Sequence, residues 1–167
     1  MFLKLVGLFH TFHSSFLILF PIFFKSIFLN IIYINYFFAI MFSYTFIQGE
    51  CPISYACKKM IDGNYNAGQN LTHYPEMLEI FANEKEVQRY LFISTYLYIC
   101  SLLYVINQTS LSLPILLFPF SIIFIYFLFT RISYLNNNAK VFAFVQEITK
   151  IASIVTIFYV STFSNKI

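Results

Sequence analysis

The chain has 167 residues, of which 59% are hydrophobic, 22% are aromatic and only 10% are charged. Soluble globular domains carry about 25% charged residues, so this composition excludes a soluble domain. It predicts one integral membrane domain over residues 1–167 in contact with the lipid bilayer. The net charge of +3 is small and scattered along the chain, which excludes nucleic acid as a partner. Phe, Tyr, Ile and Asn have AT-rich codons, and their abundance predicts a low-GC genome.

Two long apolar runs open the chain. A membrane-spanning helix needs about 20 apolar residues, and residues 5–24 and 27–47 each meet that requirement. We interpret the first run as a span and not as a secretion signal, because it is too long and has no cleavage site of small residues. The short link between the runs, next to Pro21, predicts a tight helical hairpin.

A polar loop over residues 48–89 follows and holds most of the charged residues. In its second half, Pro75 suits a first helical turn. Met77, Ile80 and Phe81 then form an apolar stripe at helical spacing. These features predict a short amphipathic helix at the membrane surface that leads into the next span.

Three further spans are predicted over residues 90–106, 113–130 and 141–163. The last contains Glu147 and Lys150, and the alternative for it is a helix that lies in the membrane interface. The predicted fold class is an all-α membrane protein. It is a bundle of four to five transmembrane helices with one polar loop that contains a short amphipathic helix.

The distribution of basic residues predicts the orientation, because cytoplasmic loops carry an excess of Lys and Arg. Most loop cations fall on one side of the predicted spans, and two fall on the other. We therefore expect the amino terminus and the 48–89 loop to be cytoplasmic. The cations on the first side are Lys4, Lys58, Lys59, Lys85, Arg89, Arg131 and Lys140, and those on the second are Lys25 and Lys166.

Two histidines lie well inside the first predicted span. His10 and His13 are three residues apart and share one helix face. Ionisable groups inside a membrane are costly and often functional, and imidazole pairs at this spacing bind zinc, copper or haem iron. The alternative is two neutral histidines that hydrogen-bond to neighbouring helices.

The cysteines do not form a recognisable redox or zinc pair. Cys51 and Cys57 are separated by five residues, which is more than zinc sites or Cys-x-x-Cys redox pairs use. Cys51 follows the second span, so it is a candidate metal ligand, a candidate for palmitoylation or a reduced thiol packed at the membrane edge. His73 joins His10 and His13 only if the loop folds back to the membrane.

Glu147 and Lys150 have two interpretations. They form either an internal, buried ion pair or part of an ion path. Gln146, Thr149 and Ser153 lie on the same side of this helix as Lys150, which predicts that this side faces the bundle or a water-filled cavity. The sequence contains no phosphate-binding glycine loop, no serine nucleophile elbow and no catalytic carboxylate pair.

The stretch after the second span resembles a family of small multi-pass membrane proteins with no established activity. That family has a histidine in the first span and a Cys-Pro-Leu-Thr box after the second, and the resemblance covers about residues 1–70. The family continues with Leu-Glu, where this chain has Ala56 and Cys57. The residues that carry the resemblance are His10 or His13, then Glu50 and the box Cys51, Pro52, Ile53 and Ser54, then Lys58 and Lys59, and the stretch Asp62, Gly63, Asn64, Tyr65, Asn66, Ala67 and Gly68.

The resemblance implies an architecture and a conspicuous loop, but no reaction. The sequence therefore favours a non-catalytic membrane protein that works through packing or through contacts with other membrane proteins or with itself. No cofactor is predicted on this interpretation. One alternative is a metal-binding, haem-binding or redox protein that uses His10, His13 and Cys51. The other is a small transporter or channel with Glu147 and Lys150 in its path.

Overall fold

A computed structural model describes residues 1–109, 111–112, 116–117, 119, 121–122, 124–125 and 139–163. The described residues contain helices and no strands, which confirms the all-α class. The predicted span over 113–130 lies mostly outside the described residues. The helices are α1 (Phe2–Phe23), α2 (Ile27–Phe46), α3 (Pro52–Ile61), α4 (Pro75–Leu78), α5 (Glu84–Asn107) and α8 (Ala139–Phe163).

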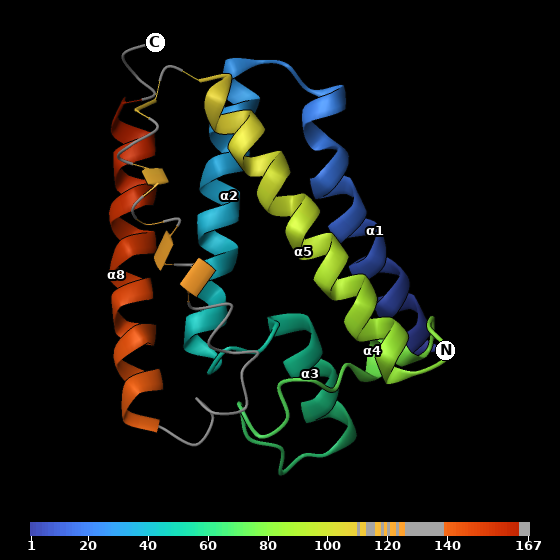
Figure 1. The fold of residues 1–167 in the computed structure, drawn as a ribbon. Coiled ribbons are helices and arrows are strands. Elements are labelled where there is room, and N and C mark those ends of the chain that lie inside the picture. The colour runs from blue at the N-terminus through green and yellow to red at the C-terminus, as the bar shows by residue number, and fades with distance from the viewer. Residues whose placement is uncertain are drawn as a thin grey trace.

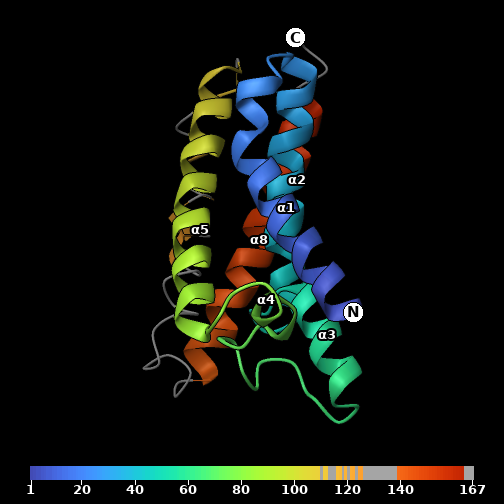
Figure 2. The ribbon, with the colours of Figure 1, turned by 90° about the vertical axis from the view of Figure 1, so that its right-hand side faces the viewer.

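Four of these helices are long and apolar enough to cross a membrane, within the part of the chain that the structure describes. They are α1, α2, α5 and the segment Val141–Thr162 of α8. Figure 1 shows them side by side, with α2 between α8 and the pair α1 and α5. Both α3 and α4 lie at the end of the bundle where α1 begins, and the link from α1 to α2 lies at the opposite end (Figures 1 and 2).

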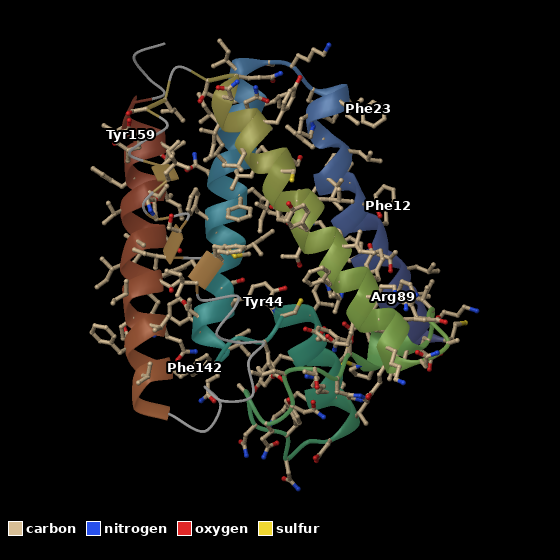
Figure 3. The ribbon with its side chains drawn as sticks, viewed as in Figure 1. Phe12, Phe23, Tyr44, Arg89, Phe142 and Tyr159 are labelled. Atoms are coloured by element: carbon tan, nitrogen blue, oxygen red, sulfur yellow. The ribbon has the colours of Figure 1, made fainter. Side chains whose placement is uncertain are left out.

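Aromatic and aliphatic side chains from α2 and α5 form the core of the bundle. Tyr33, Phe37 and Phe38 of α2 pack with Leu102 and Ile106 of α5, and all five are buried. The outer faces of the helices are equally apolar. On α1, for example, Phe12 and Phe23 project away from the bundle, as Figure 3 shows, and each is 69% exposed. A bundle with apolar side chains both inside and outside is solvated by lipid.

The polar stripe of the last helix faces the bundle. Gln146, Thr149 and Ser153 of α8 are buried, on the helix that packs along α2. The Lys150 ammonium lies 2.6 Å from the Glu147 carboxylate, but the Glu147 side chain is 65% exposed. The pair therefore forms at the outer edge of α8 and is not buried as the sequence suggested.

The loop holds its short amphipathic helix in the first half and not in the second. Pro52 occupies the first turn of α3, a position where its missing N–H is not needed. In the second half, α4 is a single turn that is buried against α1. A separate helix then begins at Glu84, because the Asn83 side chain accepts a hydrogen bond from the Glu86 amide at 3.0 Å. The predicted surface helix from Pro75 was therefore wrong.

Close contact between α1 and α4 depends on Gly7. A Cβ atom added at Gly7 would lie 2.1 Å from the backbone oxygen of Glu76. We therefore expect Gly7→Ala to push α4 away from α1 and to destabilise the protein by about 1–3 kcal/mol, the usual range for overpacking. Thermal unfolding in detergent measures the effect. Gly63→Ala is the matched control, because a Cβ there meets nothing within 4 Å, and equal stability of both variants would contradict the close contact.

Candidate functional site

Three side chains that lie far apart in the sequence meet where α1, α3 and α4 converge. The Nδ1 atom of His10 lies 3.1 Å from the Glu76 carboxylate, and Nε2 lies 3.7 Å from the Cys51 sulfur. Since a carboxylate only accepts hydrogen bonds, Nδ1 is the donor to Glu76, and Nε2 is the ring nitrogen that faces the Cys51 sulfur. This is the arrangement of a nucleophile, a base and a group that orients the base.

Local backbone structure places Cys51 at the beginning of a helix. Cys51 is the N-cap residue of α3, with extended backbone angles, and Pro52 follows in the first turn. A residue before proline prefers this extended conformation. The sulfur is therefore close to the positive end of the α3 dipole. The hydroxyl of Tyr44, near the end of α2, also hydrogen-bonds to the Cys51 side chain.

Glu76 is a fully buried carboxylate, with an exposed fraction of 0%. Its Oε1 atom accepts hydrogen bonds from His10 and from the Ser54 hydroxyl. Burial raises the pKa of Glu76, but these hydrogen bonds outweigh burial and hold the pKa below its usual value. The Oε2 atom has no hydrogen-bond partner among the described residues. Glu76 is therefore ionised at neutral pH and holds the His10 ring in place.

The pKa values of the two loop thiols are shifted in opposite directions. Burial raises the pKa of Cys51, but the hydrogen bond and the charge of His10 lower it by more than burial raises it. The pKa of Cys51 therefore lies below its ordinary value. For Cys57, burial and then the Glu76 charge both raise the pKa, to about 11. The nucleophile of a thiol enzyme is the thiolate. Cys51 is therefore the more acidic thiol of this loop, and Cys57 is a buried thiol with a raised pKa.

A cavity of about 280 Å³ opens beside the cluster. Cys51, His10 and Tyr44 line it near the loop, and the aliphatic or aromatic side chains of Leu17 and Phe37 line it within the bundle. A polar cluster next to a mostly apolar cavity is the common form of a small-molecule site. The thiol is thus accessible to a ligand in the cavity although Cys51 itself is only 6% exposed.

The other predicted ligands do not join the cluster. His13 lines the same cavity, but its Nε2 atom lies 2.6 Å from the Tyr36 hydroxyl. The loop does fold back to α1, yet His73 pairs at 2.9 Å with Glu84 in an exposed position. Among the described residues, no group of three or more His, Cys, Asp or Glu side chains is arranged to hold a metal ion.

Hydrogen bonds within the loop motif hold α3 in place beside the site. Lys58 donates a hydrogen bond to Glu50 at 2.7 Å, and the Tyr65 hydroxyl donates to the same carboxylate. Lys58 also donates to the backbone oxygen of Asn70 at 2.5 Å. Gly68 has a φ of +84°, which favours glycine. These contacts tie the loop to α3, the helix that presents Cys51.

The remaining residues of the motif shape the loop. The Asp62 carboxylate accepts a hydrogen bond from the Asn64 amide at 2.9 Å and closes a turn. Gly63 lies at this turn in open space. Asp62, Gly63 and Tyr65 belong to the predicted motif, but the burial of Glu50 and Glu76 was not predicted. Both were carboxylates in a polar loop, where exposure to water is the usual expectation.

Comparison with protein-family models, with curated proteins and with solved structures finds no match for this chain. The resemblance of about residues 1–70 to a membrane-protein family therefore stays a prediction. The chemistry of the cluster has to be inferred from its geometry, its burial and its charges.

The low pKa of Cys51 predicts selective alkylation. At pH 7, iodoacetamide should modify Cys51 faster than Cys57, because the pKa of Cys51 is lowered and that of Cys57 is raised, so Cys51 has the larger thiolate fraction. The variant His10→Ala loses the hydrogen bond and the charge that lower the Cys51 pKa, so burial then raises that pKa. The alkylation rate of Cys51 at pH 7 should fall about tenfold or more, the equivalent of one pKa unit. In the intact protein the rate should rise with pH and level off below the ordinary thiol pKa of about 8.5.

Peptide mass spectrometry of the alkylated protein in detergent measures each rate separately. His73→Ala is the matched control, since His73 pairs with Glu84 away from the cluster. Equal rates for Cys51 and Cys57, or a Cys51 rate that is insensitive to His10→Ala, would contradict the lowering of the Cys51 pKa by His10.

Proposed function

We propose that this integral membrane protein is a thiol-dependent acyl-transfer enzyme with Cys51 as its nucleophile. One observation carries the proposal: His10 contacts the Cys51 sulfur with Nε2 and the buried Glu76 carboxylate with Nδ1. That geometry matches a nucleophile–base–carboxylate triad, which is recognised by its roles and not by the order of its residues.

Each step of the reaction is within reach of these groups. Cys51 gives its proton to Nε2 of His10, and the sulfur attacks the carbonyl carbon of an acyl ester or thioester. The resulting oxyanion collapses, and the bond from the carbonyl carbon to the leaving oxygen or sulfur breaks. The carbon–sulfur bond to Cys51 remains, and the leaving alcohol or thiol takes the proton from His10. Water then gives a proton to His10 and attacks the acyl carbonyl carbon. The carbon–sulfur bond breaks, a carboxylic acid is released, and His10 returns the proton to the Cys51 sulfur.

Donors for the oxyanion are present on the same side of the cavity. Pro52 has no N–H, so the first backbone N–H of α3 belongs to Ile53, which lines the cavity. The first N–H groups of a helix have no partner within the helix. The Tyr44 hydroxyl lines the cavity as well and hydrogen-bonds to the Cys51 side chain. Donors of this kind stabilise the charge that develops on the carbonyl oxygen.

The other functions have less support from the geometry. A non-catalytic role in packing or partner contact explains the buried histidine but not a low-pKa thiol beside a cavity. Metal or haem binding would need His13 next to Cys51, and His13 contacts Tyr36 instead. An ion path through Glu147 and Lys150 would need the pair inside the bundle, and Glu147 is exposed.

We also propose that the loop and the amino terminus face the cytoplasm. Lys4 lies near the start of α1, and Lys58, Lys59 and Lys85 belong to the loop and the start of α5. This end of the bundle is opposite to the α1–α2 link that contains Lys25. The excess of cations at the loop end supports a cytoplasmic location under the positive-inside rule.

The triad is tested with p-nitrophenyl butyrate, an activated acyl ester. The purified protein in detergent should release p-nitrophenol and gain one butyryl group on Cys51, as seen by intact mass. Cys51→Ser and His10→Ala should lower the rate about 10³-fold or more. Glu76→Gln should lower it about 10²-fold and move the rising limb of the pH profile to higher pH, because the charge that stabilises the imidazolium is lost.

Matched controls separate chemistry from folding. Cys57→Ser, His73→Ala and Glu79→Gln change the same residue types outside the triad and should keep the rate within about twofold, provided that Cys57→Ser folds. Loss of the reaction in Cys57→Ser but not in Cys51→Ser would show that Cys57, and not Cys51, is the nucleophile, and would contradict the proposal. No acylation of the folded protein at all would favour the non-catalytic role.

Topology is tested with Gly63→Cys. A Cβ at Gly63 meets nothing within 4 Å and the residue is exposed, so the new thiol is accessible from water. We expect a membrane-impermeant maleimide to label it only after the cells are permeabilised. The natural Cys51 and Cys57 are buried, and the unsubstituted protein measures their background. Labelling of intact cells would reverse the proposed orientation.

A further inference from the structure

We propose that the acyl group transferred by Cys51 is a single long, unbranched fatty chain, and that the cavity beside Cys51 holds this chain among the membrane-spanning helices. This inference rests on the proposed function, since it names the substrate of the same thiol. It depends on the length, the lining and the volume of the cavity, none of which the triad itself requires.

The cavity extends along the helices. On α1 its lining runs from His10 to Leu17, and on α5 it runs from Leu91 to Ile99. At 1.5 Å per helical residue, these stretches are about 10–12 Å long. Cys51 lies at the loop end of this length and Leu17 at the opposite end. A ligand whose carbonyl carbon is at Cys51 therefore has its remaining atoms between the spans.

The lining of the cavity selects an uncharged, apolar ligand. No Asp, Glu, Lys or Arg is among the described residues that line it. Within the bundle its walls include Leu17, Phe37, Met41 and Ile99. A charged group in such a place would lose its hydration without gaining an oppositely charged carboxylate, ammonium or guanidinium partner. A methylene chain gains about 0.8 kcal/mol for each buried CH₂ group.

The volume limits the ligand to one chain. A cavity of about 280 Å³ is just below the range of about 300–1,000 Å³ typical for small-molecule sites. Such a volume favours one chain over two, and the first part of one extended chain, about as long as an octanoyl group, spans the cavity from Cys51 to Leu17. Polar groups that remain outside, such as a carrier thiol or a lipid headgroup, lie toward the loop, where Thr72 and Tyr74 line the cavity.

The acyl group reaches Cys51 from one of two sources with the same chemistry. It is carried either as a thioester from the aqueous side or as an ester of a lipid in the bilayer. Both place one carbonyl at Cys51 and one chain in the cavity. The thioester is delivered from water, and the lipid ester only from a membrane, so presenting each source separately distinguishes them.

The experiment measures acylation of Cys51 in the full-length protein by intact mass and peptide mapping. One arm offers acetyl, octanoyl and palmitoyl thioesters of coenzyme A to the protein in detergent. A second arm reconstitutes the protein in phosphatidylcholine vesicles with isotopically labelled palmitoyl chains. We expect octanoyl or palmitoyl transfer from at least one source to be at least tenfold faster than acetyl transfer.

Variants that fill the inner end of the cavity test the same inference. Leu17→Phe should slow palmitoyl transfer at least tenfold and leave acetyl transfer within twofold, because only the long chain reaches Leu17. Leu19→Phe is the matched control, since Leu19 is 43% exposed on the outer side of α1. Ile99→Phe, which narrows the cavity from α5, is the second variant should Leu17→Phe fail to fold.

The outcomes separate the two proposals. Equal acetyl and palmitoyl rates, both lost in Cys51→Ser, would overturn the fatty-chain substrate while the thiol chemistry stands. The same holds if both cavity-filling variants fold and leave the chain-length preference unchanged. No acylation from any donor, including p-nitrophenyl butyrate, would overturn the thiol chemistry itself.

Discussion

Insertion of Glu76 against the first helix is the constraint on which the rest of the site depends. A buried carboxylate without partners is strongly unfavourable, and the Glu76 side chain is completely buried. His10 and Ser54 provide the compensating hydrogen bonds, and Gly7 provides the space for the Glu76 backbone. The same contacts fix the tautomer of His10, so one insertion both closes the loop onto the bundle and orients the base beside Cys51.

Two buried carboxylates in one loop have different partners and therefore different roles. Glu50 pairs with Lys58, and Lys58 also donates to the backbone oxygen of Asn70, so this pair anchors the loop to α3. Glu76 pairs with His10, whose Nε2 atom contacts the Cys51 sulfur. The loop thus has one ion pair that holds α3 in place and a second pair that positions the imidazole ring beside the thiol.

The spans could be predicted because the lipid imposes a length of apolar residues, and α1 and α2 begin and end within three residues of their predicted bounds. His10 and Cys51 were also identified, from the cost of an ionisable group in a span and from the box after the second span. Glu76 was missed because its neighbours fit a helical stripe, which indicated a surface helix. Its burial depends on Gly7, a contact between distant residues that local periodicity does not encode.

The depth of Cys51 determines which reactants can meet there. α3 begins where α2 has just left the bundle, so the thiol lies between the polar loop and the apolar cavity. In the acyl-transfer reaction that we propose, the acyl chain approaches this thiol from the bundle and the second reactant approaches from the loop. Cys51 is buried, and Thr72 and Tyr74 line the cavity on the loop side. On that proposal, these two residues lie where water or another hydroxyl or thiol would accept the acyl group.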